Sequence, residues 1–297
     1  MNLKPAHMLL ALLVTAIWGF NFVVIKVGVA HVPPLLLTGL RFLFAAVPAV
    51  FFVKRPGVSW RWVVGYGMFI GVLQFGLLFV SIRLGMSAAL ASVVMQLQVF
   101  FTIGFAAVLL GEKSKPVQLI GAAIAFSGMA VIAASRWSGP EFLPLALCIL
   151  AALSWGIANL IVKMSGEKNA LSMISWASLA APIPLFVLSA LFEDHAAITD
   201  GLLHPGLLMI SSIAFLAWPA TIFGFGVWSF LLSRYPANLV SPFALMVPVF
   251  GIASGVLILD EPFGIPAIVG SALVFSGLLL NVIGPRLFSQ PAPAAPQ

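Results

Sequence analysis

Charged side chains are scarce in this sequence. Of its 297 residues only 7% are Asp, Glu, Lys or Arg, whereas 62% are hydrophobic. A soluble domain carries roughly 25% charged residues, so a surface this poor in charge excludes a water-soluble enzyme. The length leaves room for about ten apolar spans of roughly 20 residues with short connections, and for no extramembrane catalytic domain. We therefore predict a multi-pass membrane protein that is not an enzyme.

Cysteine is almost absent too, since Cys148 is the only one and lies in an apolar run. A single cysteine excludes an intrachain disulfide and a cysteine-rich metal site, and we expect no metal or other cofactor. The net charge of +6 comes without a basic run longer than Lys54–Arg55. The sequence therefore predicts no nucleic-acid surface, and its basic residues report membrane topology instead.

The apolar runs also lack acidic residues and histidine. All eight Asp and Glu and all four His lie at the ends of these runs or in loops. An intramembrane enzyme would need a nucleophile with a base, or a metal cluster, at this depth. A proton-coupled exporter of cationic drugs would ordinarily need a buried carboxylate. The pattern favours a neutral or zwitterionic cargo moved by facilitated diffusion or exchange, with proton-coupled efflux of drugs or other toxic compounds as the alternative.

Long apolar runs are what the sequence does contain. They are bounded by Pro, Gly or charged residues, and none alternates with the period of two typical of β-barrel strands. Each is close to the roughly 20 residues that cross a bilayer as a helix. The fold class is therefore predicted to be all-α with ten transmembrane helices. They cover residues 8–28, 34–53, 62–82, 87–110, 117–135, 142–163, 170–192, 206–232, 236–259 and 266–285.

The distribution of Lys and Arg predicts the orientation. With the N-terminus inside, ten of the fourteen basic residues face the cytoplasm and three face outward, and Arg41 lies within a span. Cytoplasmic loops are enriched in Lys and Arg, so both termini are predicted to be cytoplasmic. The segment 287–297, rich in Pro and Ala, is expected to be a disordered cytoplasmic tail.

Short motifs recur along the chain at an offset of 137 or 149 residues. The matching pairs are Trp18 and Trp155, Gly19 and Gly156, Lys26 and Lys163, Glu112 and Glu261, and the segments Gly121–Gly128 and Gly270–Gly277. They predict two five-helix halves, residues 1–136 and 137–286. Because five is odd, the second half must enter the membrane upside down. Inverted repeats place a cargo site near the middle of the membrane and permit alternating access.

The segment Trp18–Lys26, followed by Pro33–Phe42, resembles the drug/metabolite transporter superfamily, and specifically its EamA branch. The motifs Leu110–Glu112 and Leu259–Glu261 are similar to the ends of that family's repeats, and the resemblance extends over residues 8–285. It implies a ten-helix inverted-repeat fold and outward export of small metabolites. Within the branch, the sequence looks most like bacterial exporters of amino acids and their metabolites, of the cysteine/O-acetylserine and aromatic amino-acid type.

We therefore expect a bacterial inner-membrane protein that exports neutral, small or aromatic amino acids or related metabolites by alternating access. Its expected partners are the small-molecule cargo and membrane lipids, and it is expected to act as a monomer. The uncharged polar and indole side chains within the spans are the predicted cargo site: Trp18, Asn21, Gln74, Gln96, Trp155, Asn159 and Trp218. Amides bind both a carboxylate and an ammonium, and indoles attract cations. Helix-to-helix hydrogen bonding is the competing role for each.

Arg41 is the one charge clearly within a span, and its guanidinium is suited to attract a cargo carboxylate. The alternative is that it bonds helix-end carbonyls or snorkels outward. Gln98, two residues from Gln96, is interpreted as a packing residue. Prolines inside spans are expected to kink them. Pro219 and Pro242 are the hinge candidates among them, with fixed curvature as the other interpretation.

Overall fold

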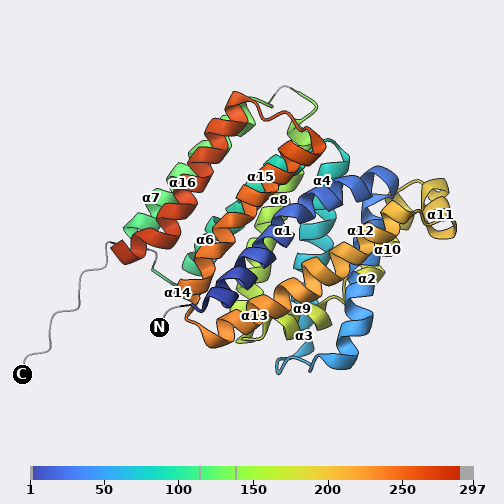
Figure 1. Cartoon of the computed structure of the whole chain (residues 1–297), viewed down its shortest axis with the longest axis horizontal. Coiled ribbons are helices and arrows are strands. Elements are labelled where there is room, and N and C mark those ends of the chain that lie inside the picture. The colour runs from blue at the N-terminus through green and yellow to red at the C-terminus, as the bar shows by residue number, and fades with distance from the viewer. Residues whose placement is uncertain (1–2, 114, 138, 288–297) are drawn as a thin grey trace, which may run out of the picture.

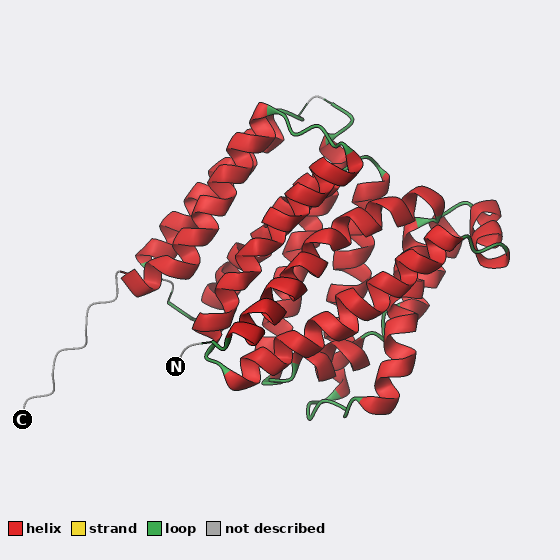
Figure 2. Cartoon of the chain, in the orientation of Figure 1, coloured by secondary structure: helices red, strands yellow, loops and turns green. Residues whose placement is uncertain are grey.

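The computed structural model describes residues 3–113, 115–137 and 139–287, and within these ranges all regular structure is helical (Figure 2). Nine helical segments of this described part are long and apolar enough to cross a membrane, and one bent helix pair brings the number to ten. The predicted all-helical, multi-span fold is confirmed at this level. The predicted tail lies almost entirely outside the described residues.

The first half of the chain contains α1 (Pro5–His31), α2 (Pro34–Phe52), α3 (Trp60–Gly67), η1 (Met68–Phe75), α4 (Gly76–Arg83), α5 (Ala88–Val94), η2 (Met95–Leu97), α6 (Gln98–Leu110) and α7 (Pro116–Ala134). The second half contains α8 (Phe142–Ser165), α9 (Ala170–Ala177), α10 (Pro182–Phe192), α11 (His195–Leu203), α12 (Leu207–Ala217), η3 (Trp218–Phe223), α13 (Gly224–Arg234), α14 (Ala237–Val240), η4 (Ser241–Leu245), α15 (Met246–Leu259) and α16 (Ile265–Leu287). The start of α1 and the end of α16 lie at the same end of the bundle (Figure 1).

Four of the spans are not regular α-helices. A π-helix, η1, joins α3 to α4, and a second, η3, joins α12 to α13. Short 3₁₀ stretches, η2 and η4, precede α6 and α15. Such segments within a helix often mark functional sites. Both hinge candidates lie in them, because Pro219 is in η3 and Pro242 is in η4.

The predicted span 170–192 is broken rather than continuous. Its two parts, α9 and α10, are bent by 44° relative to each other. The break precedes Pro182, the first residue of α10, and a proline has no backbone N–H to bond to the preceding turn, so it suits the first turn of a helix rather than its interior. Pro48, by contrast, lies inside α2 without ending it. The sequence did not predict α11, which has no buried residue, begins at the N-cap Asp194 and stands away from the bundle (Figure 1).

Glycines allow the central helices to cross closely. α1 packs along α15 at Gly19, where a Cβ atom would lie 2.8 Å from the carbonyl oxygen of Val247. α8 packs along α6 at Gly156, where a Cβ atom would lie 2.7 Å from the Cβ atom of Phe101. A side chain at either glycine would separate the two helices, so each close crossing depends on the absence of a Cβ atom.

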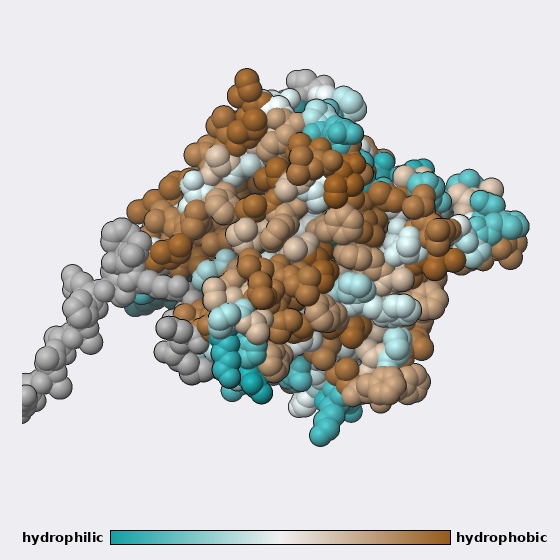
Figure 3. All heavy atoms as spheres, in the orientation of Figure 1, coloured by the Kyte–Doolittle hydropathy of each residue, from teal (hydrophilic) through white to brown (hydrophobic). Residues whose placement is uncertain are grey.

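The helices α7 and α16 lie side by side at one edge of the bundle (Figure 1). A Cβ atom on Gly121 would lie 2.7 Å from the carbonyl oxygen of Gly277, and one on Gly128 would lie 2.5 Å from that of Gly270. The repeated glycine motif is therefore the contact surface of this pair. The visible face of the bundle is largely apolar, and its hydrophilic residues gather at the ends, as a membrane protein requires (Figure 3).

Candidate functional site

Arg41 on α2 is the most unusual polar residue of the bundle interior, since it is only 2% exposed. Its Nη2 donates a hydrogen bond to the Oγ1 of Thr221 at 3.1 Å. Its Nε and Nη1 have no hydrogen-bond partner among the described residues, and none of their ion pairs includes this side chain. A buried cation without an acidic partner is costly. Arg41 is therefore a candidate site for an anionic group.

Two neighbouring elements hold the Arg41 guanidinium in place. Its Cζ lies 3.8 Å from the ring centroid of Phe75, the last residue of η1, a distance suited to a cation–π contact. The Thr221 hydroxyl, in η3, donates to the carbonyl of Leu216 at 2.8 Å. Because its proton is used there, the hydroxyl oxygen is left to accept from Arg41. Both π-helices thus contact the buried charge.

Trp18 joins α1 to the same part of η3. Its Nε1 donates to the carbonyl of Ala220 at 2.9 Å, directly beside the threonine that holds Arg41. Its ring packs against Phe225 and Trp228, with centroid distances of 5.5 and 5.3 Å. Gly224 leaves the space for this indole, because a Cβ atom there would lie 2.6 Å from Nε1. η3 therefore contacts both α1, through Trp18, and α2, through Arg41.

Two buried amides carry unpaired acceptors. Asn21, one turn after Trp18 on α1, is 7% exposed, and Gln74, which precedes Phe75 in η1, is 1% exposed. The Oδ1 of Asn21 and the Oε1 of Gln74 have no hydrogen-bond partner in the part of the chain that is described. Unpaired acceptors of this kind are complementary to an ammonium group, as the unpaired donors of Arg41 are to a carboxylate.

Asn159 belongs to a separate contact between α8 and α6. Its Nδ2 donates to the Oε1 of Gln98 at 2.6 Å and to the Oγ1 of Thr102 at 3.1 Å. Gln98 was interpreted from the sequence as a packing residue because it lies two positions from Gln96. Thr102 was not singled out, because a threonine in an apolar helix gives no signal of its own. Trp155, one turn earlier on α8, packs against both large apolar clusters of the core.

Further predicted residues line two cavities. Trp218, which is 50% exposed, and Pro219 line an apolar cavity of about 700 Å³ that opens on the surface of the bundle, together with Ile17 and Pro48. The Nε1 of Trp218 donates to the carbonyl of Phe44 at 3.1 Å. This cavity shares η3 with the Arg41 site, because Thr221 lies between two of its lining residues.

Gln96 lies elsewhere, in a cavity of about 400 Å³ lined by residues of α5, α15 and α16. The buried Ser271 of that cavity has an Oγ without a partner among the described atoms. Pro242 lines neither cavity. No three His, Cys, Asp or Glu side chains within the described ranges are placed to hold a metal ion.

The model of the EamA-like transporter family matches residues 6–134 and again residues 143–283. The chain is 42% identical to a probable amino-acid metabolite efflux pump of Escherichia coli K12, over 93% of this chain and 95% of that protein. It is 41% identical to a protein of the same description from Salmonella typhimurium, over 94% and 95%.

More distant matches extend over the whole fold. An uncharacterized transporter of Bacillus subtilis is 30% identical, over 90% of this chain and 94% of that protein. One solved crystal structure matches with a TM-score of 0.64 at 19% identity, covering 97% of this chain and 100% of that one. That likeness concerns the fold alone.

Proposed function

Because the chain belongs to the EamA-like transporter family, and is thus a multi-pass transporter of the bacterial inner membrane, we propose that it exports neutral amino acids or closely related metabolites. The transport is by alternating access, through facilitated diffusion or exchange, and one chain is the working unit. The observation that carries the proposal is the buried Arg41, whose Nε and Nη1 lack partners in the described part of the chain. The carboxylate of the cargo is the group that pairs with it.

The chemistry of an α-amino acid matches the unpaired atoms around α1, α2 and η1. Arg41 offers donors for the carboxylate. Asn21 and Gln74 offer the acceptors that an ammonium requires. Trp18 supplies an aromatic face one turn before Asn21 on α1. A zwitterion satisfies donors and acceptors together, whereas a cationic drug would meet the charge of Arg41 with its own.

The apolar cavity at η3 is the proposed vestibule for the cargo side chain. Its lining is hydrophobic and includes Trp218 and Pro219, which suits small neutral and aromatic side chains better than charged ones. Gln96, Trp155 and Asn159 are proposed to contact cargo in other conformations of the cycle. Pro219 and Pro242 are proposed to supply flexibility within η3 and η4.

We also propose that residues 1–136 and 137–286 are inverted repeats with both chain ends in the cytoplasm. The two π-helices support this, because each interrupts the third of the five spans in its half. The glycine crossings also support it. Gly19 faces α15 at Phe250 and Gly156 faces α6 at Phe101, and the two phenylalanines differ by the repeat offset of 149. Such a symmetry gives two exchangeable conformations around one site.

Counterflow in liposomes tests the proposal. Purified protein is reconstituted, the vesicles are loaded with an unlabelled amino acid, and uptake of the labelled form is followed with and without a proton gradient. We expect counterflow of neutral or aromatic amino acids that does not depend on the gradient. No uptake above empty vesicles across the panel would refute the proposal, and gradient-dependent uptake of drugs alone would favour the alternative.

A further inference from the structure

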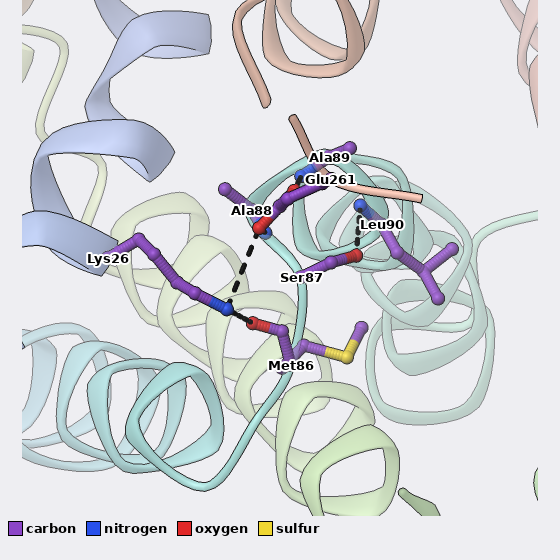
Figure 4. A network of polar contacts seen from close by, with 7 residues as sticks. All are labelled: Lys26, Met86, Ser87, Ala88, Ala89, Leu90 and Glu261. Atoms are coloured by element: carbon purple, nitrogen blue, oxygen red, sulfur yellow. Dashed lines mark hydrogen bonds and ion pairs between the residues drawn. The ribbon is translucent and has the colours of Figure 1, made fainter. Parts of the chain in front are cut away.

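Glu261, which follows α15, holds the beginning of another span. Its carboxylate accepts hydrogen bonds from the backbone N–H groups of Ala88 at 2.7 Å and Ala89 at 2.9 Å (Figure 4). Lys26 of α1 lies 3.6 Å from the same carboxylate and donates to the carbonyl of Met86 at 3.3 Å. The Glu261 side chain is only 7% exposed. One carboxylate therefore ties α1, α5 and α15 together.

Glu112 lies 149 positions before Glu261 and follows α6. The helices α5 and α6 belong to one span, so Glu261 docks at the start of this span and Glu112 follows its end. The backbone N–H of Glu112 donates to the carbonyl of Ala106 at 3.3 Å, as that of Glu261 donates to the carbonyl of Gly255 at 3.3 Å. The residue before each glutamate is left-handed, with φ of 67° and 50° respectively. Equivalent helix endings thus present the two carboxylates at opposite ends of the bundle.

The two carboxylates differ in what they bind. Glu112 pairs with Lys163 of α8, but the two side chains are 47% and 46% exposed. Among the described residues, Glu112 accepts no backbone hydrogen bond. An exposed ion pair contributes little, whereas a buried carboxylate at a helix start is held by charge-assisted hydrogen bonds. The contacts of Glu261 therefore hold their helices together more firmly than those of Glu112 do.

One residue difference parallels this asymmetry. A Cβ atom on Gly255 would lie 2.8 Å from the Oε2 of Glu261 and 2.8 Å from the backbone nitrogen of Ala89. Gly255 therefore makes room for the docked carboxylate. The equivalent residue in the first half is Ala106. Its methyl group is the Cβ atom that Gly255 lacks. Docking of Glu112 is the more crowded of the two.

We propose that Lys26–Glu261 and Lys163–Glu112 are latches that close opposite ends of the transport path in turn. The proposal rests on the alternating access of the proposed function. When the Glu261 latch opens, the start of α5 separates from α15 and the path opens at that end. Glu112 then docks on the first N–H groups of α14, the repeat equivalent of α5.

Met86 provides a reporter, because its side chain is fully buried beside the latch. In a Cys148→Ala background, Met86→Cys introduces the only thiol, and a maleimide reacts with it only when this end opens. The protein is labelled in nanodiscs, where both faces are accessible. Glu261→Gln should raise the labelling rate about tenfold or more, because a charged acceptor of two hydrogen bonds becomes neutral. Glu112→Gln, the matched change at the other latch, should leave the rate unchanged or lower it.

A second pair of variants leaves every charge in place. Gly255→Ala should raise the labelling rate by crowding the Glu261 carboxylate, and Ala106→Gly should also raise it by making room for Glu112. If Glu261→Gln does not fold, the labelling rates of Gly255→Ala and Ala106→Gly test the proposed latches in its place. Equal labelling in the parent, Glu261→Gln and Gly255→Ala would overturn the proposal, as would an equal rise in Glu112→Gln.

The labelling requires no cargo, so the two proposals fail separately. A labelling response without amino-acid counterflow would refute the proposed cargo and leave the latches in place. Counterflow without a labelling response would refute the latches alone.

Discussion

Replacing Arg41 by methionine separates a binding role from a packing role. Methionine retains most of the side-chain length and apolar volume but removes the charge and every donor. If Arg41 serves the cargo, Arg41→Met abolishes transport and leaves the protein folded. If Arg41 serves packing, the free energy of unfolding falls first.

The contacts of Arg41 set the size of each effect. The substitution removes one hydrogen bond from a charged donor to Thr221, worth about 1.5–3 kcal/mol. It also removes the contact with Phe75, worth about 2 kcal/mol when desolvated. Against these losses, it relieves the desolvation of a buried ion, which costs several kcal/mol. The free energy of unfolding should therefore change by no more than about 2 kcal/mol.

The cost to binding is not offset in the same way. A cargo carboxylate that loses a buried charged partner loses about 2–5 kcal/mol, which is roughly thirtyfold or more in affinity. The assay compares initial counterflow rates and melting temperatures for the parent, Arg41→Met and Arg55→Met, the last being an exposed arginine in a loop. A melting temperature that falls in proportion to transport would assign Arg41 to packing, and transport that persists at the parental rate would exclude Arg41 as a cargo-binding residue.

Two further variants test the packing of the bundle. Gly128→Val should lower the free energy of unfolding by about 1–3 kcal/mol through overpacking, because a Cβ atom there would lie 2.7 Å from that of Leu273. Gly104→Ala is the control, since a Cβ atom at Gly104 would have no neighbour within 4 Å. Equal melting temperatures for the two variants would contradict this prediction. A double-mutant cycle of thermal unfolding can measure the 2.6 Å hydrogen bond between Asn159 of α8 and Gln98 of α6. We expect Asn159→Leu and Gln98→Leu to show a coupling energy of about 0.6 kcal/mol. Strictly additive effects of the two substitutions would exclude that bond.

The positions of the spans were predictable because long apolar runs have a direct physical meaning in a bilayer. The irregular segments were not. A π-helix leaves no hydrophobic period in a sequence that is apolar throughout, so η1 has no signal, and in η3 only Pro219 gives one. The short helix α11 was missed for a related reason: its nine residues are too few for a span and none of them is buried.

The candidate site was predictable only in part. Arg41 stands out as a lone charge in a span, yet its partner Thr221 looks like any small residue of an apolar helix. Lys26 and Glu261 stand out because each has a counterpart of the same type in the other half of the chain. Such a match pairs Lys26 with Lys163 and Glu261 with Glu112, and it gives no sign that Lys26 contacts Glu261. The contact between them joins α1 to the end of α15, and such a pairing between different elements depends on the tertiary fold.

Competition between two compounds that differ only in the carboxylate tests most directly whether Arg41 binds the carboxylate of the cargo. Counterflow of a labelled aromatic amino acid is measured in liposomes while the unlabelled amino acid or its decarboxylated amine is added in increasing concentration. We expect the amino acid to compete and the amine to require at least about thirtyfold more for the same inhibition. Equal inhibition by the two compounds would contradict the assignment of Arg41 as the carboxylate site.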